Sequence, residues 1–310
     1  MTTTPNLMPT VMPPRMEGSV KPEHSRKSPA LLARVATVCR GIGCLVFWNW
    51  RGEVVNHETE LLPTDQLPSI PGGWTTIECR FGDLCVRLTL PAKPDDFLDD
   101  ADVRRANRES DYMPYWAYLW PASQAMSQLL LNENWKPGTR ALELGTGVGL
   151  VGIAGLASGL DLTFSDYDRS SVEAAQRNAA TNGFADVGGM IFDWRQLEEV
   201  AVERFEVILG CEVIYEAVSH PFVLDVLDKL LRADGVCWIA DPGRPHVRAF
   251  CSLAESRGYE ITLRDQTGLE RLRLAGEFDL PRDEFRLIVL RRRVGQARPS
   301  VAEFSLATHG

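Results

Sequence analysis

Short apolar runs alternate with longer segments of helical spacing along most of the chain after residue 136. The runs expected to form strands are 141–144, 160–165, 189–192, 205–209, 236–240, 259–264 and 284–291. Helical spacing is expected over 123–131, 150–158, 170–181, 219–231 and 246–257. This alternation predicts a doubly wound, mostly parallel α/β sheet. Such sheets bind ligands beyond the carboxyl ends of their strands.

The N-terminal part has a different pattern. Prolines, threonines and serines dominate residues 1–29, and prolines and glycines are frequent before Trp74. We therefore predict a disordered tail and linker over 1–73. Residues 74–81 and 84–90 alternate around Gly82-Asp83, which predicts a β-hairpin. An acidic, Arg-rich stretch follows at 95–111. We expect one domain at 74–291 and a flexible C-terminal tail at 292–310.

The charge of the chain is concentrated in this domain. The whole chain has a formal charge of −9, whereas residues 76–290 contain 22 basic and 35 acidic side chains, a net −13. An acidic body argues against nucleic acid as a partner and favours a cationic substrate.

Cysteine and histidine usage argues against disulfides and metals. The seven cysteines include no C-x-x-C pair, and the five histidines lack metal-ligand spacing. We therefore expect no metal, a reducing compartment and a cytoplasmic location. The most apolar early stretch, Ala30 to Trp50, is interrupted by Arg34 and Arg40, so no membrane span is predicted.

A glycine-rich loop follows the first strand of the alternating region, and it has two readings. Gly147-x-Gly149-x-x-Gly152 matches the dinucleotide fingerprint, and Asp166 lies 19 residues after Gly147, which alone suggests NAD. The register Glu143-x-Gly145-x-Gly147-x-Gly149 instead fits a loop that binds S-adenosylmethionine. Glycines permit the tight turn and the close backbone approach in either case.

Charge favours the second reading. Glu143 ends the strand beside the loop, where it would repel a pyrophosphate by roughly 1–4 kcal/mol but attract the ammonium of a methionine moiety. Asp166 and Asp193 follow the next two strands. The three acids and the loop together favour S-adenosylmethionine over NAD.

Five motifs in the chain are similar to those of a known protein family. They are Trp-Ala-Tyr-Leu-Trp120-Pro-Ala, Leu-Glu143-Leu-Gly145-Thr-Gly147-Val-Gly149-Leu, Asp193-Trp194, Glu212-Val-Ile-Tyr215 and Asp241-Pro-Gly-Arg244. With them, residues 112–290 resemble the class I (seven-strand) methyltransferases. More narrowly, they resemble methyltransferase family 16, which includes the lysine methyltransferases related to the electron-transfer-flavoprotein β-subunit enzymes. The resemblance implies a Rossmann-like seven-strand sheet and S-adenosylmethionine as cofactor.

The resemblance also implies roles for individual residues. Gly145, Gly147 and Gly149 would wrap the methionine part of the cofactor, with Glu143 holding the loop or the cofactor amine. Asp166 would accept the ribose hydroxyls, although Asp168 could share or replace that role. Asp193 would take the adenine amino group, and Trp194 would lie against the ring. The full set of expected cofactor-binding residues is Trp120, Glu143, Gly145, Thr146, Gly147, Gly149, Asp166, Tyr167, Asp193, Trp194 and Cys211.

Glu212 and Tyr215 are the expected catalytic residues. Glu212 would orient the acceptor amine, and the face of Tyr215 would stabilise the ammonium. The alternative for Glu212 is that it caps the following helix. Arg244 either binds a substrate carboxylate or pairs with an acid. Cys211 has no histidine placed to activate it and is interpreted as a small buried residue rather than a nucleophile.

Three functions remain open from the sequence. The first is methyl transfer from S-adenosylmethionine to a protein lysine, by an enzyme expected to be a monomer. The second keeps the cofactor but uses a small-molecule amine or heterocycle as acceptor. The third is a cofactor-binding module without turnover.

Overall fold

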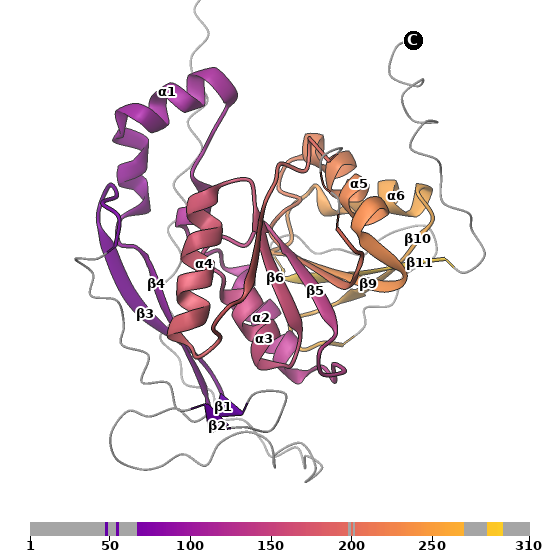
Figure 1. Cartoon of the computed structure of the whole chain (residues 1–310). Helices are drawn as coiled ribbons and strands as arrows, with labels where there is room; N and C mark the ends of the chain where they lie inside the picture. Colours follow the sequence, from indigo (N-terminus) through magenta and orange to yellow (C-terminus); the bar gives the residue numbers. More distant parts are fainter. Residues whose placement is uncertain are drawn as a thin grey trace, which may run out of the picture.

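A seven-stranded sheet forms the centre of the computed structural model (Figure 1). The structure describes residues 67–197, 200, 202–269 and 284–293, and the backbone of 47–48 and 54–55. In sheet order, the strands are β10 (Tyr259–Arg264), β11 (Arg286–Arg292), β9 (Leu231–Asp241), β8 (Phe205–Cys211), β5 (Arg140–Leu144), β6 (Asp161–Asp166) and β7 (Gly188–Ile191).

All neighbouring strands are parallel except the two pairs that contain β11. The direction of the strand order reverses between β5 and β8, and sheets of this kind bind ligands at the carboxyl ends of the strands at such a point. The predicted doubly wound, mostly parallel sheet of seven strands is confirmed.

Helices cover both faces of the sheet, because successive strand residues point to opposite faces and both sets are apolar. Phe164, Leu209 and Trp238 share one core with α2, α3 and α4, whereas Ile208 and Ile239 share another with α5 and α6. The helices are α2 (Ala122–Asn132), α3 (Leu150–Ala157), α4 (Arg169–Thr181), α5 (His220–Leu230) and α6 (Val247–Ser256). Each lies within one residue, at either end, of the range expected from helical spacing.

The predicted β-hairpin is present beside α4 (Figure 1). It consists of β3 (Trp74–Phe81) and β4 (Leu84–Pro91), which pair antiparallel over their whole length. The turn between them places Gly82 at a φ of 61°, a conformation that favours glycine. Just before β3, Ile70 packs against the apolar cluster that includes Trp116.

Two asparagines, one within α4 and one at its C-terminal end, fix the hairpin to the domain. The side-chain amide of Asn178 bonds both the N–H and the C=O of Thr89, and that of Asn182 does the same with Arg87. Asn178 also donates to the carbonyl of Val148, at the end of the glycine loop. The hairpin and the loop are therefore linked through a single buried side chain.

A hydrophilic helix occupies the acidic, Arg-rich stretch. A 3-10 turn (Pro94–Asp99) leads into α1 (Ala101–Ser110), and the carboxylate of Asp100 accepts the amide hydrogens of Asp102 and Val103. None of the residues of α1 is buried, and the helix lies at one end of the molecule (Figure 1). Val103 is the one side chain of α1 that packs against an apolar cluster, and a single such residue gives too little helical spacing to reveal the helix.

One short strand pair lies within the predicted tail and linker. Strands β1 (Phe47–Trp48) and β2 (Val54–Val55) pair antiparallel there. The rest of 1–66, and of the predicted tail the residues 294–310, lie outside the described residues. Within the described ranges, no helix combines the length and the apolar character needed to cross a membrane, and no three His, Cys, Asp or Glu side chains cluster as a metal site.

Candidate functional site

The predicted residues lie at one edge of the sheet, around the carboxyl ends of its parallel strands. Glu143 lies near the end of β5, Asp166 ends β6 and Cys211 ends β8. Asp193 and Trp194 follow β7, while Glu212 and Tyr215 lie between β8 and α5. The parallel strands therefore gather side chains that are up to 72 residues apart in the sequence, from Glu143 to Tyr215.

The glycine loop runs from the end of β5 to α3, and Gly145, Gly147 and Gly149 all have positive φ. A Cβ on Gly149 would lie 2.8 Å from the Cβ of Ala175, so only glycine allows α4 to pack this closely. A Cβ on Gly147 would meet only the carbonyl oxygen of Trp116, at 3.6 Å. Gly147 therefore leaves room for a ligand to approach the backbone.

Glu143, on the strand that precedes the loop, is bonded to the loop. Its carboxylate is buried and accepts the hydroxyl of Thr146 at 2.5 Å. A Cβ on Gly152 of α3 would lie 2.4 Å from Oε2, so the helix can approach the carboxylate only because this residue is glycine. Burial raises the pKa of Glu143 to about 8, and hydrogen bonds from Thr146 and the Gly152 amide only partly offset it. Of its two expected roles, contact with the loop is observed, and contact with the cofactor amine stays a prediction.

Asp166 connects the end of β6 to the same loop. Its Oδ2 accepts the hydroxyl of Ser171 at 2.7 Å and the amide of Gly147 at 3.4 Å, while Oδ1 accepts the amide of Asp168 at 3.1 Å. Burial raises the pKa of Asp166 to about 6 despite these bonds.

Asp168 is the less buried of the two candidate ribose acids. Its Oδ1 caps α4 by accepting the amide of Ser170, and its Oδ2 accepts the hydroxyl of Tyr112 at 2.5 Å. Tyr167, which is 44% exposed, donates its hydroxyl to the carbonyl of Met113. The aromatic segment, defined as residues 112–121, is thus tied to the end of β6.

Asp193 and Trp194 lie beyond β7. The carboxylate of Asp193 accepts hydrogen bonds from the guanidinium and the amide of Arg195. Partial burial opposes ionisation, but these bonds lower the pKa of Asp193 overall. Trp194 packs partly against the core shared with α5 and α6. An adenine amino group at Asp193 would therefore compete with Arg195.

Glu212 has an unusual backbone and a fully engaged carboxylate. Its φ is 58°, a left-handed conformation that is uncommon for any residue other than glycine. Oε1 accepts the amide of Ala122 at 2.9 Å, and Oε2 accepts Nη2 of Arg244 at 2.5 Å. Glu212 is therefore bonded to the first residue of α2, and not to the following helix α5.

Arg244 pairs with acids. Besides Glu212, it donates Nη1 to Asp241 at 3.2 Å, and its backbone amide bonds the other oxygen of Asp241 at 2.7 Å. Its guanidinium lies 6.0 Å from the ring centroid of Trp120. Of the two readings of Arg244, pairing with acids is observed, and binding of a substrate carboxylate stays a prediction.

An aromatic cluster lies beside this pair, formed by Tyr115, Tyr118, Trp120 and Tyr215. Tyr115 is 5.5 Å from Tyr215 and 6.1 Å from Trp120, and Tyr118 is 5.7 Å from Trp120, between ring centroids. Burial raises the pKa of Tyr215 to about 12. Sequence reasoning singled out Trp120 and Tyr215 but missed Tyr115 and Tyr118. The density of aromatic residues in the 112–121 segment was the available signal.

Cys211 lies between these groups. Burial, with Glu212 and Glu143 nearby, raises the pKa of its thiol well above the ordinary value. The thiol therefore stays protonated, which agrees with its interpretation as a small side chain rather than a nucleophile.

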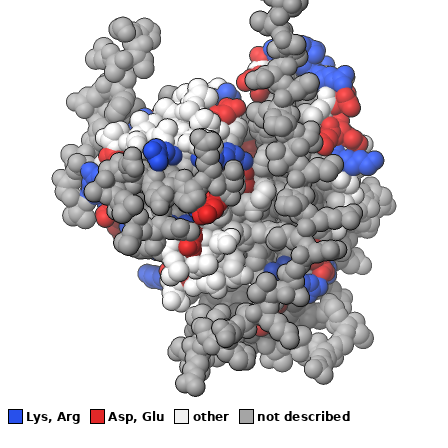
Figure 2. Space-filling view, turned by 180° about the vertical axis from the view of Figure 1, so that it is seen from behind, with Lys and Arg blue, Asp and Glu red and all other residues white. Residues whose placement is uncertain are grey.

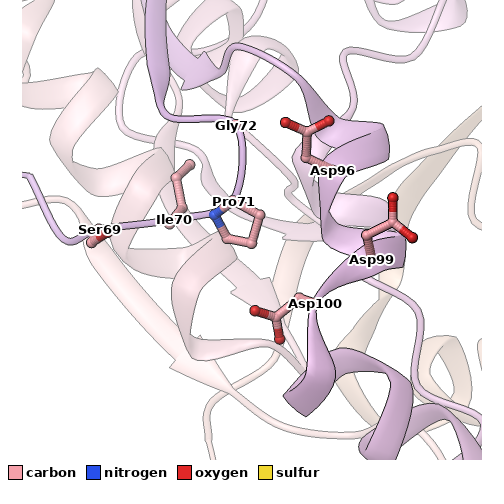
Figure 3. A pocket seen from close by; sticks show the side chains of 7 residues that line it. All are labelled: Ser69, Ile70, Pro71, Gly72, Asp96, Asp99 and Asp100. Carbon is pink, nitrogen blue, oxygen red and sulfur yellow. The ribbon is translucent and has the colours of Figure 1, made fainter.

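A surface depression of about 570 Å³ lies away from the strand ends, between the segment before β3 and the 3-10 turn before α1 (Figure 3). Its lining residues are Ser69, Ile70, Pro71, Gly72, Asp96, Asp99 and Asp100. Two of its acids serve the local structure, because Asp99 pairs with Arg104 and Asp100 caps α1. None of the predicted site residues lines it.

The sheet, the glycine loop and the strand-end acids together define a class I, seven-strand methyltransferase fold. Residues 110–250 match the family model described as "Lysine methyltransferase". The recognition of methyltransferase family 16, and of S-adenosylmethionine as its cofactor, is thereby confirmed over these residues.

Curated relatives are similar over part of the chain. The electron transfer flavoprotein beta subunit lysine methyltransferase of Xenopus laevis is 30% identical over 165 residues, which are 50% of this chain and 66% of that protein. The histidine protein methyltransferase 1 homolog of Dictyostelium discoideum is 29% identical over 39% of this chain and 41% of its own length. The chain thus spans less than two thirds of these relatives. Among solved structures, a TehB-like SAM-dependent methyltransferase from Corynebacterium glutamicum has 16% identity and a TM-score of 0.45, covering 66% of this chain and 100% of its own.

The site fits the cofactor on chemical grounds. Asp166 and Asp168 offer carboxylate oxygens to hydroxyl donors at the end of β6, where a ribose would lie. The open side of Gly147 leaves room for the methionine part. Glu212 and Asp241 supply negative charge next to the place of a sulfonium.

Proposed function

We propose that this chain transfers a methyl group from S-adenosylmethionine to a lysine side chain of a protein. The observation that carries this proposal is the fixed carboxylate of Glu212 beside the aromatic cluster. A carboxylate can orient an amine, and aromatic faces stabilise a cationic ammonium before and after transfer. The family match and the lysine methyltransferases among the relatives support the same acceptor.

The main task of the protein in this reaction is to align the acceptor nitrogen with the methyl group. The cofactor supplies an activated methyl group on a sulfonium. The lysine nitrogen, after losing its proton to solvent, forms the new N–C bond as the S–C bond breaks, and the electron pair of that bond goes to sulfur. Glu212 would hold the amine in line with the methyl group, and Tyr215 would cover one side of the acceptor. Such alignment supplies a large part of the acceleration in two-reactant steps.

The cofactor would occupy the predicted residues. The loop of Gly145, Thr146, Gly147 and Gly149 would wrap the methionine part above Glu143. Asp166 and Tyr167 would hold the ribose, with Asp193 and Trp194 at the adenine. Trp120 and Cys211 would line the space near sulfur.

Partners and location follow from charge and composition. A net −13 over residues 76–290 favours a cationic protein segment over nucleic acid. In Figure 2, acidic and basic side chains lie intermixed on the described part of the rear face and form no single basic patch there. We infer a cytoplasmic, monomeric enzyme without a metal.

The test is transfer of labelled methyl from S-adenosylmethionine to proteins of a cell lysate. The labelled proteins are then hydrolysed, and their methylated amino acids identified. Gly147→Arg, which fills the open side of the loop, should abolish labelling. Gly82→Arg is the matched control, because Gly82 also has a positive φ, so the backbone strain is similar, while a Cβ there meets no atom within 4 Å.

Each result has a separate meaning. Methyllysine in protein supports the proposal, whereas methylhistidine would replace lysine by the acceptor named for the Dictyostelium relative. Label only in small molecules favours the small-molecule N-methyltransferase. Cofactor binding by calorimetry without label in any fraction favours a binding module, and absence of binding at millimolar cofactor rejects all three.

A further inference from the structure

Arg244 lies between the two buried acids at the ends of β8 and β9. It is bonded to Glu212 through Nη2 and to Asp241 through Nη1. The side chain of Asp241 is fully buried and that of Glu212 is 3% exposed, whereas that of Arg244 is 27% exposed. The guanidinium thus separates the acids from solvent on one side.

The backbone fixes this arginine as firmly as its side chain does. Oδ1 of Asp241 accepts the amides of Gly243 and Arg244, at 2.8 Å and 2.7 Å. The turn after β9 is therefore closed on the same carboxylate that holds the guanidinium. An arginine anchored at both ends is suited to holding a partner in place and poorly suited to swinging aside.

Charge adds a second argument. Glu212 and Asp241 carry two negative charges, and among the described residues Arg244 is their single ion-pair partner. One negative charge remains next to the aromatic cluster, where it would attract the sulfonium of the methyl donor and the ammonium that forms as the neutral lysine amine is methylated. Removing Arg244 would leave two neighbouring buried carboxylates unpaired, which is strongly unfavourable.

We propose that Arg244 is a positioning residue: it fixes the carboxylate of Glu212 against the amide of Ala122, in the place where the acceptor amine is aligned. This rests on the proposed function for its catalytic meaning, but the placement of Glu212 can be measured without turnover. The bond from Ala122 to Glu212 reports it directly, because the amide hydrogen of Ala122 exchanges faster once Oε1 moves away.

The experiment compares amide hydrogen exchange at Ala122, observed by NMR, in the full chain and three variants. Arg244→Ala should speed exchange at Ala122 about tenfold or more, because Glu212 then no longer holds that amide. A tenfold change corresponds to a loss of about 1.4 kcal/mol in the free energy of opening the hydrogen bond. Arg244→Lys keeps the charge but loses the two-pronged geometry, so its exchange rate at Ala122 should lie between those of the wild type and Arg244→Ala. Arg232→Ala is the control, since Arg232 pairs with Asp234 and Glu206 at the start of β9.

Methyl transfer to lysate protein is measured on the same samples, with and without guanidinium chloride at roughly 50 mM. Guanidinium should restore both slow exchange and part of the transfer in Arg244→Ala, which a merely structural role would not allow. The proposal is overturned if Arg244→Ala leaves exchange at Ala122 unchanged, or if it raises transfer, as expected were Arg244 occupying the place of the lysine. If even the wild type transfers no methyl, the proposed function fails, and the exchange data still decide the placement of Glu212.

Discussion

Among the described residues, the acids in one half of the site pair with a cation and those in the other half do not. At the ends of β5 and β6, Glu143 and Asp166 accept bonds from hydroxyl groups and backbone amides. At the ends of β8 and β9, Glu212 and Asp241 share the guanidinium of Arg244. We refer to these as the loop half and the acceptor half.

This difference suggests that the loop half supports the structure and that the acceptor half provides charge for the reaction. Neutral donors do not compensate the cost of burying a charge, so burial raises the pKa of Glu143 to about 8 and that of Asp166 to about 6. At pH 7 Glu143 is therefore mostly protonated, whereas Asp166 stays mostly ionised. The acceptor half keeps an ion pair and one excess negative charge, which would stabilise the sulfonium donor and the ammonium that forms on the methylated acceptor.

Replacing the matched acids of the two halves should have the largest effect. Glu212→Gln removes the charge from the acceptor half and should lower methyl transfer by roughly 10²–10³-fold, as for other lost groups that act on charge during reaction. Glu143→Gln mimics the protonated acid of the loop half and should leave transfer within a few-fold of wild type at pH 7. Transfer of label to lysate protein and calorimetry with S-adenosylhomocysteine measure both variants.

Equal losses in the two variants would contradict the division into halves. A loss of cofactor affinity in Glu212→Gln as large as the loss of transfer would place Glu212 with the cofactor instead of the acceptor.

The positions of the glycine loop and the strand-end acids could be predicted from the sequence. The hydrogen bonds and ion pairs that these acids form could not. The loop and the acids at the ends of β5 and β6 were predicted because each follows an apolar strand, and parallel strands end at a common edge. The bonds of Glu212 to Ala122 and Arg244 join residues 90 and 32 positions away, and no local pattern encodes them. The positive φ of Glu212 was equally hidden, because such conformations are usually signalled by glycine or asparagine.

The pH dependence of stability should distinguish the halves next. The pKa of Glu143 is about 8 in the folded chain and near 4.5 in the unfolded chain, so the folded state holds the extra proton between these values. Its contribution to the free energy of unfolding is complete below pH 4.5 and is lost as the pH rises through 8. Wild type should therefore lose about 3–4 kcal/mol relative to Glu143→Gln from pH 5 to pH 8, at no more than ~1.4 kcal/mol per pH unit. Urea unfolding at several pH values measures the difference. Parallel curves for the two proteins would show that Glu143 is ionised throughout.

Two glycines of α3 test how tightly the loop half is packed. In Gly152→Ala, the new Cβ would lie 2.4 Å from both Oε2 of Glu143 and Cε1 of Phe164, so we expect a loss of about 1–3 kcal/mol. In Gly155→Ala, the Cβ would meet the ends of Leu162 and Leu160 at 3.1 Å and 3.3 Å, which can move. The gain in helix propensity should then leave that variant near wild type. Chemical unfolding compares them. Similar stabilities of the two variants would mean that Glu143 is not held against α3.

The smallest expected effect concerns the aromatic segment, which joins the halves. Tyr112 at its start bonds Asp168 of the loop half, and Trp120 near its end lies by Arg244 of the acceptor half. Tyr112→Phe removes one hydrogen bond and should cost about 1 kcal/mol in unfolding free energy. Because α2 and Arg244 hold Glu212 independently, exchange at Ala122 should not change in this variant. Tyr167→Phe, which frees the carbonyl of Met113 in the same segment, is the matched control. If Tyr112→Phe instead speeds exchange at Ala122, a change in the loop half alters the acceptor half through the aromatic segment. The two halves would then be energetically coupled.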